Sequence, residues 1–308
     1  YLLQKIHIRV YLEEMPPVLG NRDFDCVDAI IIVSPRYYEY AVNFSLYHPE
    51  YNIGIVNTDW IFQNFDEAEM PSLSGFASGN QPLRNVLASK YNYSLALRII
   101  SFLRSIRNSS VKYIILMGNV IDVPPSYYYW DSCFYAYYKN AEQSWIPTDI
   151  FYASPDYDYY PEFAVSRIPF IGEQDISTYI NKVKNWLYEF YNNKTWVKKI
   201  AVVGGMPFGT LYYSGEATIL DIINSGYLGN LTIEKYFETN AKYTTENVRM
   251  LYKGGRIFIL QFSHGTETSF VKLSKFDHRW IKLIDNNYLM TLQDARQLPL
   301  IVAPVCSS

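Results

Sequence analysis

The alternation of strand-like and helix-like segments along this 308-residue chain is the feature that most constrains its fold. Residues 26–34 and 111–120 are short apolar runs of strand length, whereas residues 93–110 carry apolar side chains at helical spacing. The alternation restarts at residue 197 and continues to an apolar run at residues 298–306. Strands that alternate with helices form mainly parallel sheets flanked by helices, so we predict an α/β fold.

The restart divides the chain into two predicted α/β subdomains, residues 22–195 and residues 196–308. Residues 1–14 have a strand-like pattern, and the Pro- and Gly-containing stretch after them is typical of a linker. We therefore expect residues 1–21 to be a strand and linker that precede the first subdomain.

Composition narrows the class of partner. Apolar residues make up 49% of the chain and charged residues 19%, which is typical of a globular protein. The net charge of −3 and the lack of a Lys/Arg run argue against a nucleic-acid partner. No apolar run reaches the roughly 18–20 residues of a membrane span, and no signal peptide precedes the first segment, so we expect a mature piece or fragment.

Tyrosine content and glycosylation sequons favour a secreted or cell-surface glycoprotein. The chain has 30 tyrosines, as many as its acidic residues together. Asn-X-Ser/Thr sequons begin at Asn43, Asn92, Asn108, Asn193 and Asn230. We therefore predict an extracellular or cell-surface location.

The three cysteines, Cys26, Cys133 and Cys306, leave at least one thiol unpaired within the chain. Cys26 precedes one predicted strand and Cys133 follows another, so they could form a disulfide. Two separate buried thiols are an equal alternative.

His264 and Cys306 lie at the ends of two apolar strands, residues 256–265 and 298–306. The carboxyl ends of parallel strands meet at one edge of a sheet, which is where α/β folds bind ligands. If the two strands are neighbours, the imidazole and the thiol come close together. A cysteine nucleophile requires such a base at its side.

The segment "FILQFSHGTETSF" followed by "LPLIVAPVC" resembles the gingipain family of cysteine peptidases, in the caspase–hemoglobinase superfamily. The resemblance continues upstream in "VKYIILMGNVIDVPPSYY" and in "PTDIFYASPDYDYYPEFAVSRIPF". "VDAIIIVSPRYYE" and "IGIVNTDWIFQNF" are similar to the opening of the family's first subdomain. The matches follow one another in order over nearly the whole chain, and they imply two caspase-like subdomains.

The resemblance implies that Cys306 is the nucleophile and His264 the general base of a cysteine endopeptidase. The imidazole would take the thiol proton, because only the thiolate is a good nucleophile. The backbone N–H groups of Gly265 and Cys306 would form the oxyanion hole. Such a peptidase needs a protein or peptide substrate and no cofactor.

Two positions depart from the family pattern. Arginine-specific members carry an acid in a Gly-Glu-Ser-Asp run, where this chain has Gly215-Glu216-Ala217-Thr218, so arginine specificity is not implied. We expect Glu216 and Thr218 to lie near the substrate, although Glu216 also suits a helix N-terminus. Some members place a Glu before the Gly-Gly pair to support the histidine, but this chain has Val203 there. The site is therefore a dyad, or Glu267 orients His264.

The chain ends two residues after Cys306, whereas the family continues beyond its cysteine. "KIHIRVYLEE" resembles the last strand of the family's β-rich prodomain. We therefore expect the rest of its own precursor, a prodomain and a C-terminal segment, to be a partner. A cut at this point and a fragment of a longer protein are both consistent with this end.

Asp149, Asp156, Asp158 and Glu162 form an acidic group in a predicted loop. Such oxygen-rich groups suit calcium, and members of the family bind it, so Asp156, Asp158 and Glu162 are candidate ligands of a structural Ca²⁺. A turn whose Asp side chains cap backbone N–H groups is the alternative. The tyrosine clusters of residues 126–160 favour packing, although a binding surface would use the same residues.

Two function classes follow. The first is a cysteine endopeptidase without evident arginine specificity. The second is a non-catalytic surface or assembly protein that keeps the peptidase fold. The occurrence of both Cys306 and His264 in register favours the first class, because a structural role requires neither.

Overall fold

The computed structural model describes residues 24, 26–69, 92–129, 145–192, 195–205, 214–266, 268–273, 279–292 and 297–303. The chain forms two compact units, Tyr1–Ile180 and Asn181–Ser308, whose division falls within the long helix α7 (Glu173–Asn192). The predicted subdomain boundary at residue 195 stays a prediction. The predicted N-terminal strand and linker, residues 1–21, lie outside the described residues.

The first unit is built on a parallel four-stranded sheet with the order β2-β1-β3-β6. Its central strand β1 is buried along its whole length because every residue from Ala29 to Val33 is apolar. The strands are β1 (Ala29–Val33), β2 (Ile53–Asn57), β3 (Tyr113–Met117) and β6 (Ala164–Ile168). An antiparallel pair, β4 (Ser126–Tyr129) and β5 (Trp145–Thr148), lies outside this sheet.

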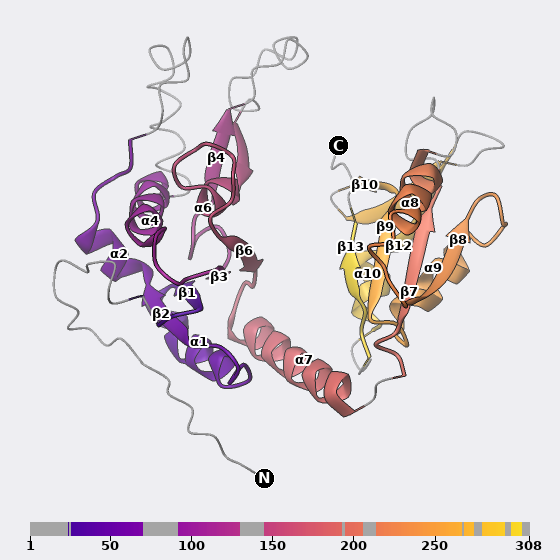
Figure 1. Cartoon of the computed structure of the whole chain (residues 1–308), viewed down its shortest axis with the longest axis horizontal. Helices are drawn as coiled ribbons and strands as arrows, with labels where there is room; N and C mark the ends of the chain where they lie inside the picture. Colours follow the sequence, from indigo (N-terminus) through magenta and orange to yellow (C-terminus); the bar gives the residue numbers. More distant parts are fainter. Residues whose placement is uncertain are drawn as a thin grey trace. The chain divides into compact units, whose positions relative to one another are not determined.

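Helix α4 (Tyr93–Ile106) buries its apolar stripe against this sheet, in one cluster with Ile30 and Ile32 of β1. The helix begins where the Asn92 side chain accepts a hydrogen bond from the Leu95 N–H. Figure 1 shows α4 beside the first sheet. The other helices of this unit are η2 (Pro35–Tyr37), α1 (Tyr38–Ser45), α2 (Thr58–Asn64) and α6 (Ile150–Ala153).

The second unit is built on another parallel four-stranded sheet, with the order β13-β9-β7-β8. Side chains alternate between its faces. Ala201 and Val203 pack with helix α9, whereas Ile200 and Val202 pack with Ile219 of α8. The strands are β7 (Lys199–Gly204), β8 (Thr232–Phe237), β9 (Phe258–Phe262) and β13 (Leu300–Val302), and the helices are α8 (Ser214–Asn224), α9 (Thr245–Tyr252) and α10 (Asn286–Met290).

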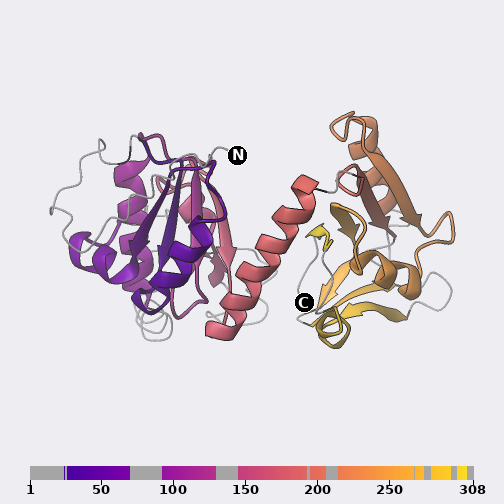
Figure 2. The same cartoon turned by 90° about the horizontal axis from the view of Figure 1, so that it is seen from below.

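A three-stranded antiparallel sheet follows β9 directly, with the order β10-β11-β12. Its strands are β10 (His264–Thr266), β11 (Ser269–Leu273) and β12 (Trp280–Asp285). The sequence pattern predicts no strands beyond residue 265 in this stretch. Figure 2 shows this sheet, drawn in yellow-orange, within the second unit.

The predicted fold class is confirmed, because both units contain a parallel sheet flanked by helices. In the described part of the chain, no helix combines the length and apolar character needed to cross a membrane.

Candidate active site

His264 lies at the carboxyl end of β9, one residue after Ser263, and begins strand β10. Strand β13 is the parallel neighbour of β9, with Leu260 opposite Val302. The condition stated for a cysteine–histidine pair, that the two strands are neighbours, is therefore met. Cys306 itself lies outside the described residues.

The sequence positions of the two residues agree with this pairing. His264 is the fourth residue after Leu260 (264 − 260 = 4), and Cys306 is the fourth after Val302 (306 − 302 = 4). Leu260 and Val302 are paired across the two neighbouring parallel strands, and each candidate residue lies four residues after its member of this pair.

The imidazole of His264 is half-buried and stacks on the indole of Trp280. The ring centroids are 4.7 Å apart, and the ring planes differ by 28°. Trp280 is the first residue of β12, and its side chain is about half exposed. The sequence does not predict this contact, because nothing in the local pattern around Trp280 relates it to His264.

A buried hydrogen-bond chain supports the end of β9 just before His264. Tyr252 of α9 donates from its hydroxyl to Oε1 of Gln261 at 2.8 Å, and Nε2 of Gln261 donates to the Ser263 hydroxyl at 3.0 Å. Burial raises the pKa of Tyr252 above its ordinary value, so the phenol stays protonated and can donate. These bonds satisfy buried polar groups and fix the strand end from which His264 projects.

Gly265 is buried in β10, opposite Phe270 of β11. It directly follows His264, so its backbone belongs to the same strand end as the imidazole. Glu267, the predicted alternative partner of His264, lies outside the described residues.

Glu216 is buried in the first turn of α8, and both of its carboxylate oxygens accept hydrogen bonds from Thr239. The backbone N–H of Thr239 donates at 3.1 Å and its hydroxyl at 2.7 Å. This arrangement connects α8 to the turn after β8. Thr218 is exposed on the same helix. Contact of either residue with a substrate stays a prediction.

Glycines allow the start of α8 to approach the end of β7 closely. A Cβ on Gly204 would lie 2.7 Å from Cδ1 of Ile219 in α8, and one on Gly215 would lie 2.6 Å from the Gly205 carbonyl oxygen. Side chains at these positions would therefore separate the helix from the strand. Val203, which precedes the glycines, is buried and apolar and offers no acceptor to a histidine.

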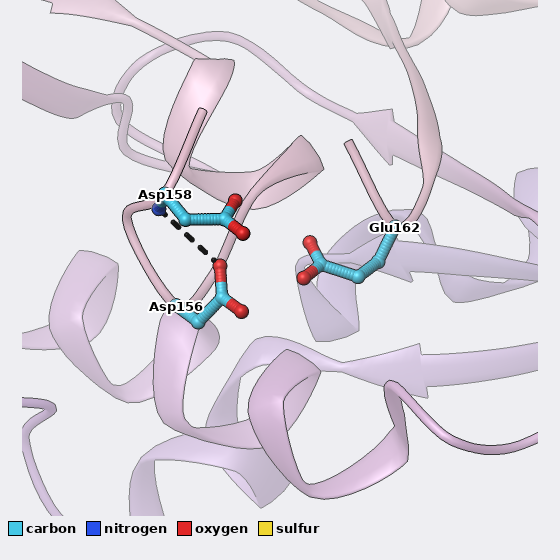
Figure 3. Close-up of side chains that lie close together, drawn as sticks. All are labelled: Asp156, Asp158 and Glu162. Carbon is cyan, nitrogen blue, oxygen red and sulfur yellow. Dashed lines mark hydrogen bonds between the residues drawn. The ribbon is translucent and has the colours of Figure 1, made fainter. Parts of the chain in front are cut away.

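Asp156, Asp158 and Glu162 of the first unit each present a carboxylate oxygen within 4.8 Å of the others. Figure 3 shows the three carboxylates facing a common space, with the Asp158 N–H bonded to Asp156. Asp149 is engaged elsewhere, since Arg167 donates to both of its oxygens, at 2.8 Å and 2.7 Å. The three remaining carboxylates are hard oxygen donors of the kind that calcium takes.

The pKa values of Asp156 and Glu162 shift in opposite directions. Burial opposes ionisation of Asp156, but the Asp158 N–H and neighbouring side chains hold the pKa of Asp156 below its ordinary value. Burial, together with the nearby Asp156 and Asp158, raises the pKa of Glu162. Crowding of negative charge around Glu162 is what a bound cation would relieve.

A Cys26–Cys133 disulfide and two separate buried thiols are the two alternatives, and the second is wrong for Cys26, which is exposed. Cys26 is exposed and carries a free thiol within the described part of the chain, and Cys133 lies outside it.

Comparison with known proteins agrees with the resemblance seen in the sequence. The family model for peptidase family C25 matches residues 23–308. A protein of Archaeoglobus fulgidus described as uncharacterized is 36% identical over 194 residues, which are 62% of this chain and 42% of that protein.

Solved structures of similar fold are peptidases. The crystal structure of the Arg-specific cysteine proteinase gingipain R has a TM-score of 0.53 at 16% identity, over 93% of this chain and 56% of that one. The complex of the Porphyromonas gingivalis RgpB pro- and mature domains has a TM-score of 0.54 at 16% identity, over 90% and 55%. The chain spans about half the length of these relatives, and at such identities the likeness concerns the fold.

Proposed function

Because the chain belongs to peptidase family C25, which indicates a cysteine peptidase, we propose that it hydrolyses peptide bonds through Cys306 and His264. The observation that carries this assignment is the parallel pairing of β9 with β13, in which the paired residues Leu260 and Val302 each lie four positions before His264 and Cys306 (264 − 260 = 4 and 306 − 302 = 4). Neighbouring parallel strands bring their carboxyl ends to one sheet edge, so the thiol and imidazole would meet there.

In the proposed reaction, His264 takes the proton of the Cys306 thiol, and the thiolate attacks the carbonyl carbon of the scissile peptide. The N–H groups of Gly265 and Cys306 donate to the oxyanion that forms. The tetrahedral species collapses, and the imidazolium gives its proton to the leaving amine. His264 then takes a proton from water, the hydroxide attacks the thioester, and the acid leaves as the thiol is restored.

The substrate is a protein or peptide, and no cofactor enters these steps. The exposed Thr218 stands where arginine-specific relatives have an acid, so preference for arginine before the scissile bond is not proposed. Thr218 and Glu267 are the proposed substrate contacts. Glu216 would act through Thr239, by holding the start of α8.

Labelling with a peptidyl acyloxymethyl ketone tests this function, because the reagent alkylates an activated thiolate in a peptide-binding site. We expect labelling of the folded wild-type protein, none of Cys306→Ala, and a strong decrease in His264→Ala. Cys26→Ala is the matched control, since its exposed thiol lies outside the proposed site and labelling should persist. Failure of the folded, processed wild type to react would contradict the proposal.

A non-catalytic surface or assembly protein of the same fold is the second candidate. It is favoured by Val203 and Thr218, which replace acids found in relatives, and by exposed tyrosines such as Tyr160 and Tyr227. An unlabelled wild type whose histidine and cysteine variants keep its native stability and assembly state would support this class.

We also propose that Asp156, Asp158 and Glu162 hold a structural Ca²⁺. Their three carboxylates supply hard oxygen ligands at mutual distances that one ion can bridge. The ion would neutralise the crowded charge of the loop after α6 and has no part in the cleavage steps.

The proposed location is extracellular or at the cell surface. The asparagines of four sequons, Asn43, Asn92, Asn108 and Asn230, are all exposed, as a glycan acceptor must be. Mass spectrometry of the protein from its source cells should find glycopeptides at these sites, and unmodified peptides from all of them would count against it. By likeness to the complex of pro- and mature domains, residues 1–21 are proposed to end a prodomain, which N-terminal sequencing of the mature protein would test.

A further inference from the structure

We propose that Trp280 is a positioning residue that fixes the orientation of the His264 imidazole through ring stacking. Its effect on peptide cleavage rests on the function proposed above, whereas the positioning itself does not. The two rings stack at 4.7 Å with 28° between their planes. Neither the family resemblance nor the local sequence assigns a role to Trp280.

The antiparallel sheet β10-β11-β12 brings the two rings together. His264 lies opposite Val271, and Trp280 lies opposite Leu273. Val271 and Leu273 are two residues apart on β11, so all four side chains lie on one face of the sheet. Val271 and Leu273 are buried, so the strand between the two rings is apolar on the face that carries them.

A base that collects a proton from a thiol must hold its ring at a defined angle, since small misplacements are costly in rate. Rotation about the Cβ–Cγ bond of His264 would break the parallel contact with the indole. Val203, at the position where some relatives carry a supporting acid, is apolar and buried in β7. Stacking on Trp280 therefore provides orientation that this position does not.

Because Trp280 is half exposed, its substitution can test the positioning of His264 without unfolding the second unit. About half of the side chain, 52%, is accessible to solvent, and the residue starts an edge strand of the small sheet. Loss of the indole should leave the buried core of the second unit intact. Ile281, the next residue on β12, points to the opposite face and is 36% exposed, so Ile281→Ala is a matched control for damage to the strand.

Nuclear magnetic resonance tests the positioning directly and without reference to activity. The indole ring current should displace the Hε1 resonance of His264, assigned by its loss in His264→Gln, from that of an exposed histidine. We expect Trp280→Ala to move this resonance by several tenths of a part per million toward the exposed value, and Ile281→Ala to leave it in place. A His264 resonance that Trp280→Ala does not move would overturn the proposal.

Hydrolysis of fluorescein-labelled casein tests the catalytic consequence. Trp280→Ala should lower kcat about tenfold to a hundredfold with little change in KM, the size expected for a misplaced catalytic group. Trp280→Phe should restore most of kcat because it keeps a stacking ring, and Ile281→Ala should match wild type. Equal losses in Trp280→Phe and Trp280→Ala, or an effect on KM alone, would also overturn it.

The His264 resonance and the cleavage of casein together distinguish a failure of this proposal from a failure of the peptidase assignment. Wild type that fails to cleave casein or to react with the peptidyl ketone, while keeping the displaced resonance, refutes the peptidase and supports the stacking. Wild type that cleaves casein, with equal cleavage by the Trp280→Ala form, supports the peptidase and refutes the positioning role.

Discussion

Glu216 commits both of its carboxylate oxygens to Thr239, whereas its sequence context suggested either substrate contact or a helix N-terminus. A Glu in the first turn of a helix is ordinarily explained by the macrodipole alone. Here the side chain is buried and connects α8 to the turn after β8, next to the glycines that let helix and strand approach. The residue therefore supports the second unit's framework.

We predict that Glu216→Ala lowers the free energy of unfolding by roughly 1–3 kcal/mol, because the two hydrogen bonds that Thr239 donates to the buried Glu216 carboxylate are lost. Urea denaturation followed by circular dichroism measures this. Glu246→Ala is the matched control, since Glu246 also lies in the first turn of a helix, α9, but is exposed. Equal effects of the two substitutions would contradict the structural role.

At the residue scale, the ordered resemblance to the gingipain family, which includes the His-Gly motif and the terminal cysteine, predicts the proposed catalytic residues from the sequence. Trp280 could not be identified in this way. Its contact with His264 depends on two strand pairings, and the residues of β11 and β12 alternate too weakly to predict them.

The small sheet β10-β11-β12 is held to the parallel sheet by a mostly buried ion pair. Lys272 of β11 donates to Oε1 of Glu238 at 2.8 Å and to the carbonyl oxygen of Tyr243, and its ammonium lies 4.7 Å from the centre of the Tyr243 ring. Glu238 directly follows β8. Burial, and then the Glu238 charge, raise the pKa of Tyr243, so its phenol stays neutral beneath the pair.

We predict that Lys272→Met destabilises the protein by roughly 3 kcal/mol, because it leaves the Glu238 carboxylate without its cation in a largely dry place. The double variant Lys272→Met/Glu238→Gln should recover part of this loss, and thermal or urea unfolding measures both. Lys282→Met is the control: its ammonium is exposed and lies 3.6 Å from Asp285, so the change should stay within about 0.5 kcal/mol. If the destabilisation of the double variant equals the sum of those of Lys272→Met and Glu238→Gln, the two side chains are not coupled and the prediction is wrong.

At the scale of elements, the alternation of periods predicted the strands of both parallel sheets and the helices α1, α4, α7, α8 and α9, because each period follows from local backbone geometry. The short helices α2, α6 and α10 were not predicted. The antiparallel pairs β4–β5 and β10-β11-β12 were not predicted. These strands mix polar and apolar residues, unlike the continuous apolar run of β1, so their pattern is weak and pairing with distant neighbours decides their structure.

At the scale of the whole molecule, the proposed calcium site and the candidate catalytic histidine lie in different compact units. The acidic group at Asp156, Asp158 and Glu162 belongs to the first unit, and His264 belongs to the second. A structural ion in the first unit would therefore stabilise that unit without entering the chemistry.

We predict that Ca²⁺ slows hydrogen exchange of amides around residues 150–168 and leaves those of β7 and β9 unchanged. At a hundred times the dissociation constant, the expected stabilisation is about 2.7 kcal/mol. Mass-spectrometric exchange with calcium and with a chelator measures the difference, with Asp156→Asn/Asp158→Asn as the variant that should lose it. Protection that is absent in wild type, or that persists in the double variant, would exclude the site.

The sequence by itself determined the α/β class and the candidate cysteine–histidine pair. The class follows from local periodicity, and the pair follows from motifs that resemble those of one family in order along the chain. Only the tertiary structure decided that β13 lies beside β9, that Glu216 bonds to Thr239 and that Trp280 stacks on His264. These contacts join residues from different elements. The packing of the whole unit selects them, and no local pattern encodes which distant partner a side chain meets.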